Sequence, residues 1–245
     1  MKIDLHIHSI ASGHALNTVD EISAYAEKCG MTHIAITDHG PAMEGAPHGG
    51  YFEVSDMVSP KRNDLKIYMG IEANILDLEG TIDLHDPYYS MQKIISAGIH
   101  EKTGFLGNSL QDNTEALLAV IKKKKCQIIT HPWRECFPVD METVTKAAIA
   151  NGVLLELNDR VFRYPTVPMI KAYKKMIDII KKAGGFFIVG SDSHVKENIG
   201  NDSHIMALKD ELGLTFENVI NNYANELEEI FDEKQNNTIS STDRS

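Results

Sequence analysis

The chain has 245 residues, of which 42% are hydrophobic, and this apolar content is enough for the core of one large α/β domain. Its formal net charge of −11 argues against a surface that wraps nucleic acid, because such a surface would be basic. The chain contains no apolar run of the roughly 20 residues that a membrane helix needs, and its three cysteines form no CxxC pair, which indicates a reduced, cytoplasmic location.

Short apolar segments alternate with helical patterns along the chain. Segments rich in Ile, Val, Leu and Phe are typical of buried parallel strands. The candidates are Lys2–His8, His33–Asp38, Lys66–Asn74, the second half of Ser90–His100, Cys126–His131, Gly152–Asn158 and Gly185–Asp192. Repeated strand–helix units predict a parallel sheet with right-handed crossovers, and seven units that close on themselves form a (β/α)7 barrel. Residues 1–232 are expected to form this single domain, followed by a disordered polar tail, Glu233–Ser245.

Helix start and stop signals separate the strands. Thr18-Val-Asp-Glu21 matches a capping box that opens a helix, and Gly30 ends this helix. Asn113 and Asp140 are candidate caps for two later helices, and Pro168 opens a third. The helices expected after these signals are Thr114–Lys125, Met141–Ala150, Met169–Lys182 and, near the C-terminus, Thr215–Asp232.

Nine potential metal ligands lie at or just past the C-terminal ends of the predicted strands, where active-site residues of β/α barrels gather. They are His6, His8, His14, His39, Glu72, His100, His131, Asp192 and His194. His6 and His8 would point the same way, because residues two apart on a strand share a face. Asp38 alternates away from His39 and is expected to support the ligands rather than bind a metal. Packing so many titratable groups together without a metal would leave their desolvation uncompensated, so the pattern predicts two or three divalent cations.

The sequence around these ligands resembles a known family. The matching motifs are Asp4-Leu-His-Ile-His8, Ile36-Thr-Asp-His-Gly40, Gly70-Ile-Glu-Ala-Asn74, Ala97-Gly-Ile-His-Glu101, Ile129-Thr-His-Pro132 and Gly190-Ser-Asp-Ser-His194. In this order they are similar to the motifs of the PHP (polymerase and histidinol phosphatase) superfamily, and within it to the YcdX-like phosphatases. The resemblance implies a distorted seven-stranded β/α barrel that holds three divalent metals, usually zinc. Imidazole and carboxylate ligands would also suit manganese or iron.

The resemblance also implies how the ligands are shared among the metals. One metal would be held by His6, His8, Glu72 and Asp192, a second by Glu72, His100 and His131, and a third by His14, His39 and His194. Glu72 would bridge two cations, since a carboxylate offers two oxygens. Glu72, Asp192 and His194 are expected to serve catalysis directly.

Three further side chains are candidates for substrate binding. Arg160 could clamp a phosphate through two hydrogen bonds, and Arg134 is a similar candidate. His48 could overhang the pocket and donate a proton to the leaving oxygen. The chain departs from the usual family pattern at Trp133-Arg134-Glu135 and at Asn158-Asp159-Arg160, both of which lie beside the expected pocket.

The expected function is hydrolysis of a small phosphate monoester by a metal-activated hydroxide, because three divalent cations would make the pocket attractive to a dianionic phosphate. Two alternatives stay open. The first is a phosphodiesterase or nuclease of the same superfamily, which the acidic chain disfavours and which the bulk of Trp133 would restrict. The second is a metal-binding module without catalysis, which a lost ligand would favour, but every expected ligand is present.

Overall fold

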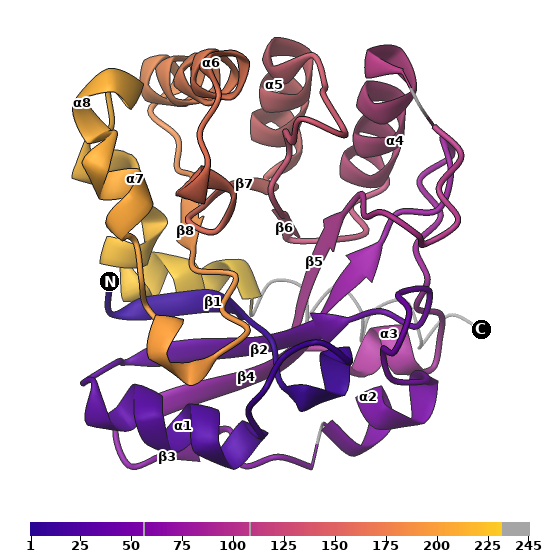
Figure 1. Ribbon diagram of the computed structural model, residues 1–245, viewed down its shortest axis with the longest axis vertical. Coiled ribbons are helices and arrows are strands. Elements are labelled where there is room, and N and C mark those ends of the chain that lie inside the picture. The colour runs from indigo at the N-terminus through magenta and orange to yellow at the C-terminus, as the bar shows by residue number, and fades with distance from the viewer. Residues whose placement is uncertain (56, 108, 232–245) are drawn as a thin grey trace.

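The computed structural model describes residues 1–55, 57–107 and 109–231 (Figure 1). Its strands are β1 (Ile3–Ile7), β2 (His33–His39), β3 (Lys61–Arg62), β4 (Leu65–Asn74), β5 (Ile94–Gly98), β6 (Ile128–Ile129), β7 (Leu154–Asn158) and β8 (Ile188–Gly190). Its helices are α1 (Val19–Lys28), α2 (Gly49–Ser55), α3 (Tyr88–Met91), α4 (Leu110–Lys122), α5 (Met141–Asn151), α6 (Val167–Ala183), α7 (Ser203–Ala207) and α8 (Lys209–Leu212). Short 3-10 helices are η1 (Ile10–Ser12), η2 (Val161–Arg163), η3 (Lys196–Asn198), η4 (Phe216–Asn218) and η5 (Ile220–Asn222). The tail expected over Glu233–Ser245 lies outside the described residues. Within those that are described, no helix combines the length and the apolar character needed to cross a membrane.

The described residues form a nearly closed barrel, as the sequence predicts. Parallel strands follow one another in the order β1-β2-β4-β5-β6-β7-β8. The ends of this sheet meet where Ile7 pairs with Ser193, and the backbone N–H of His8 donates to the Ser193 carbonyl at 2.8 Å. Helices α4 to α8 lie on one side of the strands and α1 to α3 on the other (Figure 1). The short strand β3, which was not predicted, pairs antiparallel with β4.

The inward faces of the strands are apolar at one end of the barrel and polar at the other. Ala35 on β2 belongs to a buried apolar cluster, and Tyr68 on β4 packs against it. Four residues later on the same strands come His39 and Glu72, which are neighbours across the β2–β4 pair. Because side chains an even number of positions apart share a face, one face supplies both core and candidate ligands. The apolar end is closed by residues near the C-terminus of the described chain: Ile220, Leu227 and Phe231.

The prediction of a single helix over Thr215–Asp232 is wrong. The chain instead forms η4 and η5 and becomes α-helical over residues 224–231. The Asn221 side chain accepts a hydrogen bond from the Val189 N–H at 2.8 Å and donates to the carbonyls of Ile3 at 3.0 Å and Val189 at 2.8 Å. Such side-chain bonds to backbone compete with helix formation, and here they tie β8 to β1 across the closure of the barrel.

Two predicted helix caps are confirmed and one is wrong. Thr18 forms the capping box of α1, and Asp140 accepts from backbone N–H groups at the start of α5. Helix α4, however, begins one turn earlier than predicted, because Ser109 rather than Asn113 caps it. Asn113 lies inside α4, where its side chain donates to the Pro138 carbonyl at 3.0 Å.

Candidate metal centre

Glu72 lies at the centre of the predicted ligands. It is 1% exposed, and both of its carboxylate oxygens face imidazole nitrogens. Its Oε1 lies 3.3 Å from His6 Nε2, 3.1 Å from His100 Nε2 and 3.0 Å from His131 Nε2, and its Oε2 lies 3.4 Å from His8 Nε2 and 3.0 Å from His39 Nδ1. A single buried carboxylate therefore joins histidines from both halves of the barrel.

The remaining predicted ligands gather beside this carboxylate. Asp192 Oδ1 lies 3.8 Å from His6 Nε2, 3.4 Å from His8 Nε2 and 3.3 Å from His194 Nδ1. The Nε2 atoms of His194 and His14 are 2.9 Å apart. The structure thus brings all nine predicted ligands into one cluster.

Among the residues that the structure describes, three groups of donor atoms are each compact enough to hold a cation, with all atoms of a group within 4.8 Å of one another. They are His6, His8 and Asp192; His39, Glu72 and His100; and His8, His39 and His194. The first lies within the set that the family resemblance implies for one metal, and the second combines parts of two implied sets. In the third group His8 takes the place that the resemblance gives to His14.

Hydrogen bonds at Nδ1 fix the direction of the ligand lone pairs on β1. His6 Nδ1 lies 2.7 Å from Glu156 Oε1, so we assign its proton to Nδ1. His8 Nδ1 lies 2.9 Å from Ser12 Oγ, whose own proton goes to Asp38 at 2.6 Å, so His8 is also assigned as the Nδ1–H tautomer. The Nε2 atoms of His6 and His8 then face each other at 3.1 Å. A positive group must therefore lie between these two nitrogens, either the Nε2 proton that the raised pKa of His6 provides or a metal cation that replaces it.

Two further imidazoles, His14 and His194, meet at the rim of the cluster. His14 Nδ1 lies 3.1 Å from the Ser12 carbonyl, and His194 Nδ1 lies 3.0 Å from the Asp192 carbonyl. A carbonyl can only accept, so the proton of His14 is assigned to Nδ1 and a lone pair to its Nε2. The carbonyl does not fix the tautomer of His194, because the donor Arg160 Nη1 lies 2.7 Å from its Nδ1 and 2.9 Å from its Nε2. These two Nε2 atoms are the ones that approach to 2.9 Å.

Buried atoms without hydrogen bonds lead to the same conclusion. Among the described residues, His39 Nδ1, Glu72 Oε2 and His100 Nδ1 are buried and have no hydrogen-bond partner. Buried polar groups are normally paired, so such atoms require an explanation, and an ion is one that fits. His39 Nδ1 and Glu72 Oε2 lie only 3.0 Å apart without a hydrogen bond, as two ligands of one cation would. The residues present therefore fit a cluster of divalent metals.

The electrostatics of the cluster keep most donors in the state that binds a metal. Burial opposes the charge on Glu72, but His6, His100 and His39 hold the pKa of its carboxyl well below the usual value. Burial lowers the pKa of His100 to about 4, and burial with nearby histidines lowers that of His8 well below the usual value. His6 differs, because Glu156 and other carboxylates outweigh burial and raise its pKa well above the usual value. A cation that binds at His6 would therefore displace a proton.

Glu156 is the residue of this site that sequence analysis missed. It is 1% exposed, and besides its contact with His6 its Oε2 accepts from the His131 N–H at 2.9 Å and from Asn158 Nδ2 at 3.0 Å. His131 has φ +29°, an uncommon value for a residue with a side chain. The carboxylate thus holds ligands from β1 and from the end of β6. The available signal was a glutamate inside the apolar strand Leu154-Leu-Glu-Leu-Asn158.

Asp38 supports the ligands without facing the cluster, as predicted. It accepts from the Ser9 N–H and Ser9 Oγ, both at 2.7 Å, and from Tyr51 at 2.5 Å, in addition to Ser12. Ser12 in turn holds His8. Fixing the second nitrogen of a ligand histidine in this way sets its orientation and tautomer.

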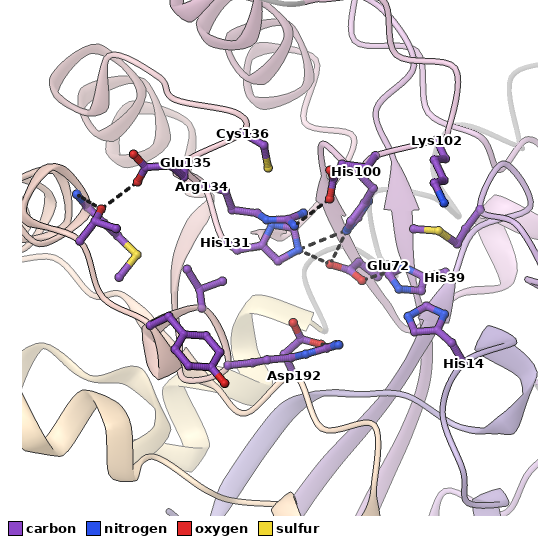
Figure 2. A pocket seen from close by; sticks show the side chains of 17 residues that line it. His14, His39, Glu72, His100, Lys102, His131, Arg134, Glu135, Cys136 and Asp192 are labelled. Carbon is purple, nitrogen blue, oxygen red and sulfur yellow. Dashed lines mark hydrogen bonds and ion pairs between the residues drawn. The ribbon is translucent and has the colours of Figure 1, made fainter.

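A pocket of about 690 Å³ opens over the cluster (Figure 2). Its floor includes His14, His39, Glu72, His100, His131 and Asp192. Both predicted arginines line it, and Arg160 Nη1 lies 3.4 Å from Asp192 Oδ1 and 2.9 Å from His194 Nε2.

Two other residues lie away from this pocket. His48 is exposed and accepts from the Gly50 N–H at 3.1 Å at the start of α2, and it is not part of the pocket lining. Trp133 is 7% exposed and packs in the main core, because its side chain turns away from the pocket. The expectation that Trp133 narrows the site for a diester is therefore wrong.

Comparison with known proteins identifies related chains. A family model described as "PHP domain" matches residues 4–235. A probable phosphatase of Proteus mirabilis is 36% identical over 220 residues, which are 89% of each chain. A probable phosphatase of Syntrophotalea carbinolica is 33% identical over 220 residues, 90% of this chain and 91% of its own.

Solved structures show the same fold at low sequence identity. The histidinol phosphate phosphatase of Lactococcus lactis, complexed with zinc, L-histidinol and phosphate, has a TM-score of 0.59 and 17% identity, and the match covers 87% of this chain and 94% of that one. A chain of an archaeal ribonuclease P with mature tRNA has a TM-score of 0.58 and 15% identity, with 96% and 90% coverage. Both likenesses establish the barrel architecture.

Proposed function

The chain belongs to the PHP domain family, and we propose that this metal-dependent phosphatase hydrolyses a small-molecule phosphate monoester with the help of three divalent cations, zinc foremost. The observation that carries the proposal is the pair His39 Nδ1 and Glu72 Oε2, two buried atoms that lie 3.0 Å apart without a hydrogen bond among the other predicted ligands, beneath an open pocket that both residues line. Open sites with several metals are usually catalytic.

The chain's own residues divide the work of the proposed reaction. Glu72, with one oxygen toward three imidazoles and the other toward two, would hold and bridge cations, while Asp192 and His194 would complete the ligand set on the β8 side. Arg160 would donate to phosphoryl oxygens next to these ligands, since a guanidinium can bind two oxygens at once. When bound, the cations would supply a hydroxide nucleophile near neutral pH and offset the charge that develops on the phosphate.

A phosphodiesterase or nuclease is the second candidate. The burial of Trp133 favours it more than the sequence did, because that side chain leaves the pocket open. The net charge of −11 still disfavours a long nucleic acid, whose backbone binds to basic surfaces.

The test compares an aryl phosphomonoester with the matching diester on metal-loaded protein. Asp192→Ala should abolish monoester turnover, whereas Asp210→Ala, a change to an exposed aspartate on α8, should leave it unchanged. Removal of metal by a chelator should abolish turnover, and added zinc or manganese should restore it. Preferred turnover of the diester would replace the monoester proposal with the second candidate. No turnover of either substrate by protein with bound metal would contradict both.

A further inference from the structure

The wall of the pocket carries an excess of positive side chains, although the chain as a whole is acidic. Above the floor of ligands, the pocket is lined by Lys102, Arg134 and Arg160 but only by two acidic side chains, Glu101 and Glu135. In the whole chain the balance is reversed, with 24 lysines and arginines against 35 aspartates and glutamates. Basic side chains thus outnumber acidic ones on this wall by three to two, and a net positive charge attracts anionic ligands.

Among the described residues, neither acidic side chain forms a close ion pair with the basic side chains of the wall. Glu101 Oε2 lies 3.5 Å from Arg134 Nη2 and its side chain is 64% exposed, so the pair is weak. Glu135 accepts a hydrogen bond from Thr166 Oγ1 at 2.8 Å. Arg134, which lies over the Phe137 ring at 5.9 Å, keeps most of its five N–H donors for a ligand.

The three basic side chains, Lys102, Arg134 and Arg160, do not all bind at one phosphate position. Arg160 follows β7 and lies against Asp192, next to the proposed metal ligands. Lys102 follows β5 and Arg134 follows β6, and Figure 2 shows both on the opposite side of the pocket from Asp192. Among the described residues, no ion-pair partner of Lys102 is found, and its side chain is exposed. Two regions of positive charge thus flank the metal cluster.

The pocket is also larger than a phosphate group requires. Its volume of about 690 Å³ lies within the range of roughly 300–1,000 Å³ that is typical of sites for organic ligands. The pocket therefore has room for the organic part of a substrate beside the predicted metal ligands, and Lys102 and Arg134 belong to its lining.

We propose that the substrate carries a second anionic group, a phosphate or a carboxylate, which Lys102 and Arg134 bind while the phosphate monoester lies at the metal ligands. This inference rests on the proposed phosphatase function and specifies the class of substrate. A cationic substrate is disfavoured, because it would meet the excess positive charge of the wall.

The experiment uses three substrates on one carbon chain: 1,3-propanediol monophosphate, 3-(phosphonooxy)propanoate and 1,3-propanediol bisphosphate. For the metal-loaded wild-type protein, KM should be about tenfold lower for the two substrates with a second anion, because hydrogen bonds between charged groups are stronger than those between neutral groups. A comparison of KM for 3-(phosphonooxy)propanoate and for the bisphosphate shows whether the second anion is a carboxylate or a phosphate. Equal KM values for all three substrates would overturn the proposal.

Variants assign the preference to the two side chains. Lys102→Met and Arg134→Met should each reduce the KM preference about tenfold, Arg134→Lys should retain part of it, and Lys122→Met, an exposed control at the end of α4, should retain all of it. An equal loss on all three substrates would mean that Lys102 and Arg134 act on the reacting phosphate, which would contradict a second anion site.

A binding measurement separates this proposal from the proposed function. Propane-1,3-bisphosphonate and propylphosphonate cannot be hydrolysed, and calorimetry on metal-loaded protein compares their affinities directly. The second site would be supported, even if no ester is turned over, if the bisphosphonate binds more tightly than the monophosphonate and if Lys102→Met reduces this difference. Equal affinities would overturn it whatever the activity.

Discussion

Replacing Glu156 with glutamine tests whether this buried carboxylate organises the metal ligands. Its two oxygens accept from His6 Nδ1 at 2.7 Å, from the His131 N–H at 2.9 Å and from Asn158 at 3.0 Å. A glutamine has nearly the same shape but only one oxygen. Its NH2 group must therefore face a donor, either the Nδ1–H of His6 or the N–H groups of His131 and Asn158.

Either orientation of the amide should weaken metal binding. If the NH2 faces His6, the imidazole must accept at Nδ1, which moves its proton to Nε2 and removes the lone pair that faces His8. If it faces His131, a ligand with φ +29° loses the bond that holds its backbone. Changes to residues that orient metal ligands typically cost 10- to 100-fold in affinity, or about 1.4–2.7 kcal/mol.

The assay is competition for zinc between the protein and a chelator of known affinity, with metal stoichiometry measured by mass spectrometry. Cobalt(II) absorption spectra provide a second readout, because they report ligand geometry directly. Glu142→Gln, a change to a partly exposed glutamate on α5, is the matched control and should bind zinc like the wild type. Wild-type affinity and an unchanged cobalt spectrum in Glu156→Gln would refute the role of Glu156.

Three other predictions concern stability and ionisation. Gly190→Ala should lower the free energy of unfolding by about 1–3 kcal/mol in urea titrations, because the added Cβ would lie 2.0 Å from the Glu156 carboxylate; an unchanged value would contradict this contact. Ser109→Ala should lower it by about 1 kcal/mol through loss of the α4 cap, and a neutral effect would argue against that cap. Lys146 and Lys175 lower the pKa of Glu142 to about 2, so the stabilisation from these ion pairs should be present above pH about 4.5 and lost as the pH falls through about 2. Carbon NMR of the Glu142 carboxyl should show a titration midpoint near 2, whereas a midpoint near 4.5 would exclude the interaction.

The sequence by itself determines the order of the strands and the set of candidate metal ligands. The alternation of Leu5, His6, Ile7 and His8 assigns two histidines to one face, and this depends only on the geometry of an extended chain. The sheet order that the structure shows follows from repeated strand–helix units in the same way. Patterns of this kind are local, so they can be read before any tertiary contact is known.

Helix boundaries depend partly on tertiary contacts, which explains the errors in predicting them. Asn113 has the chemistry of a cap, yet it lies inside α4 because Ser109 satisfies the N-terminal donors one turn earlier. The region after Thr215 has few helix breakers, but Asn221 bonds to backbone on β8 and β1 and interrupts it. The sequence does not show that these partners are close.

Only the tertiary structure decides what surrounds the ligands. Glu156 lies 150 residues from His6 in sequence, and their contact exists because β1 and β7 both border β8 in the barrel. Likewise Lys102 and Arg134 line one pocket because the loops after β5 and β6 leave the same end of the sheet, while Trp133 turns into the core. A local pattern fixes which face of a strand a side chain occupies, but barrel closure determines which distant side chain it meets.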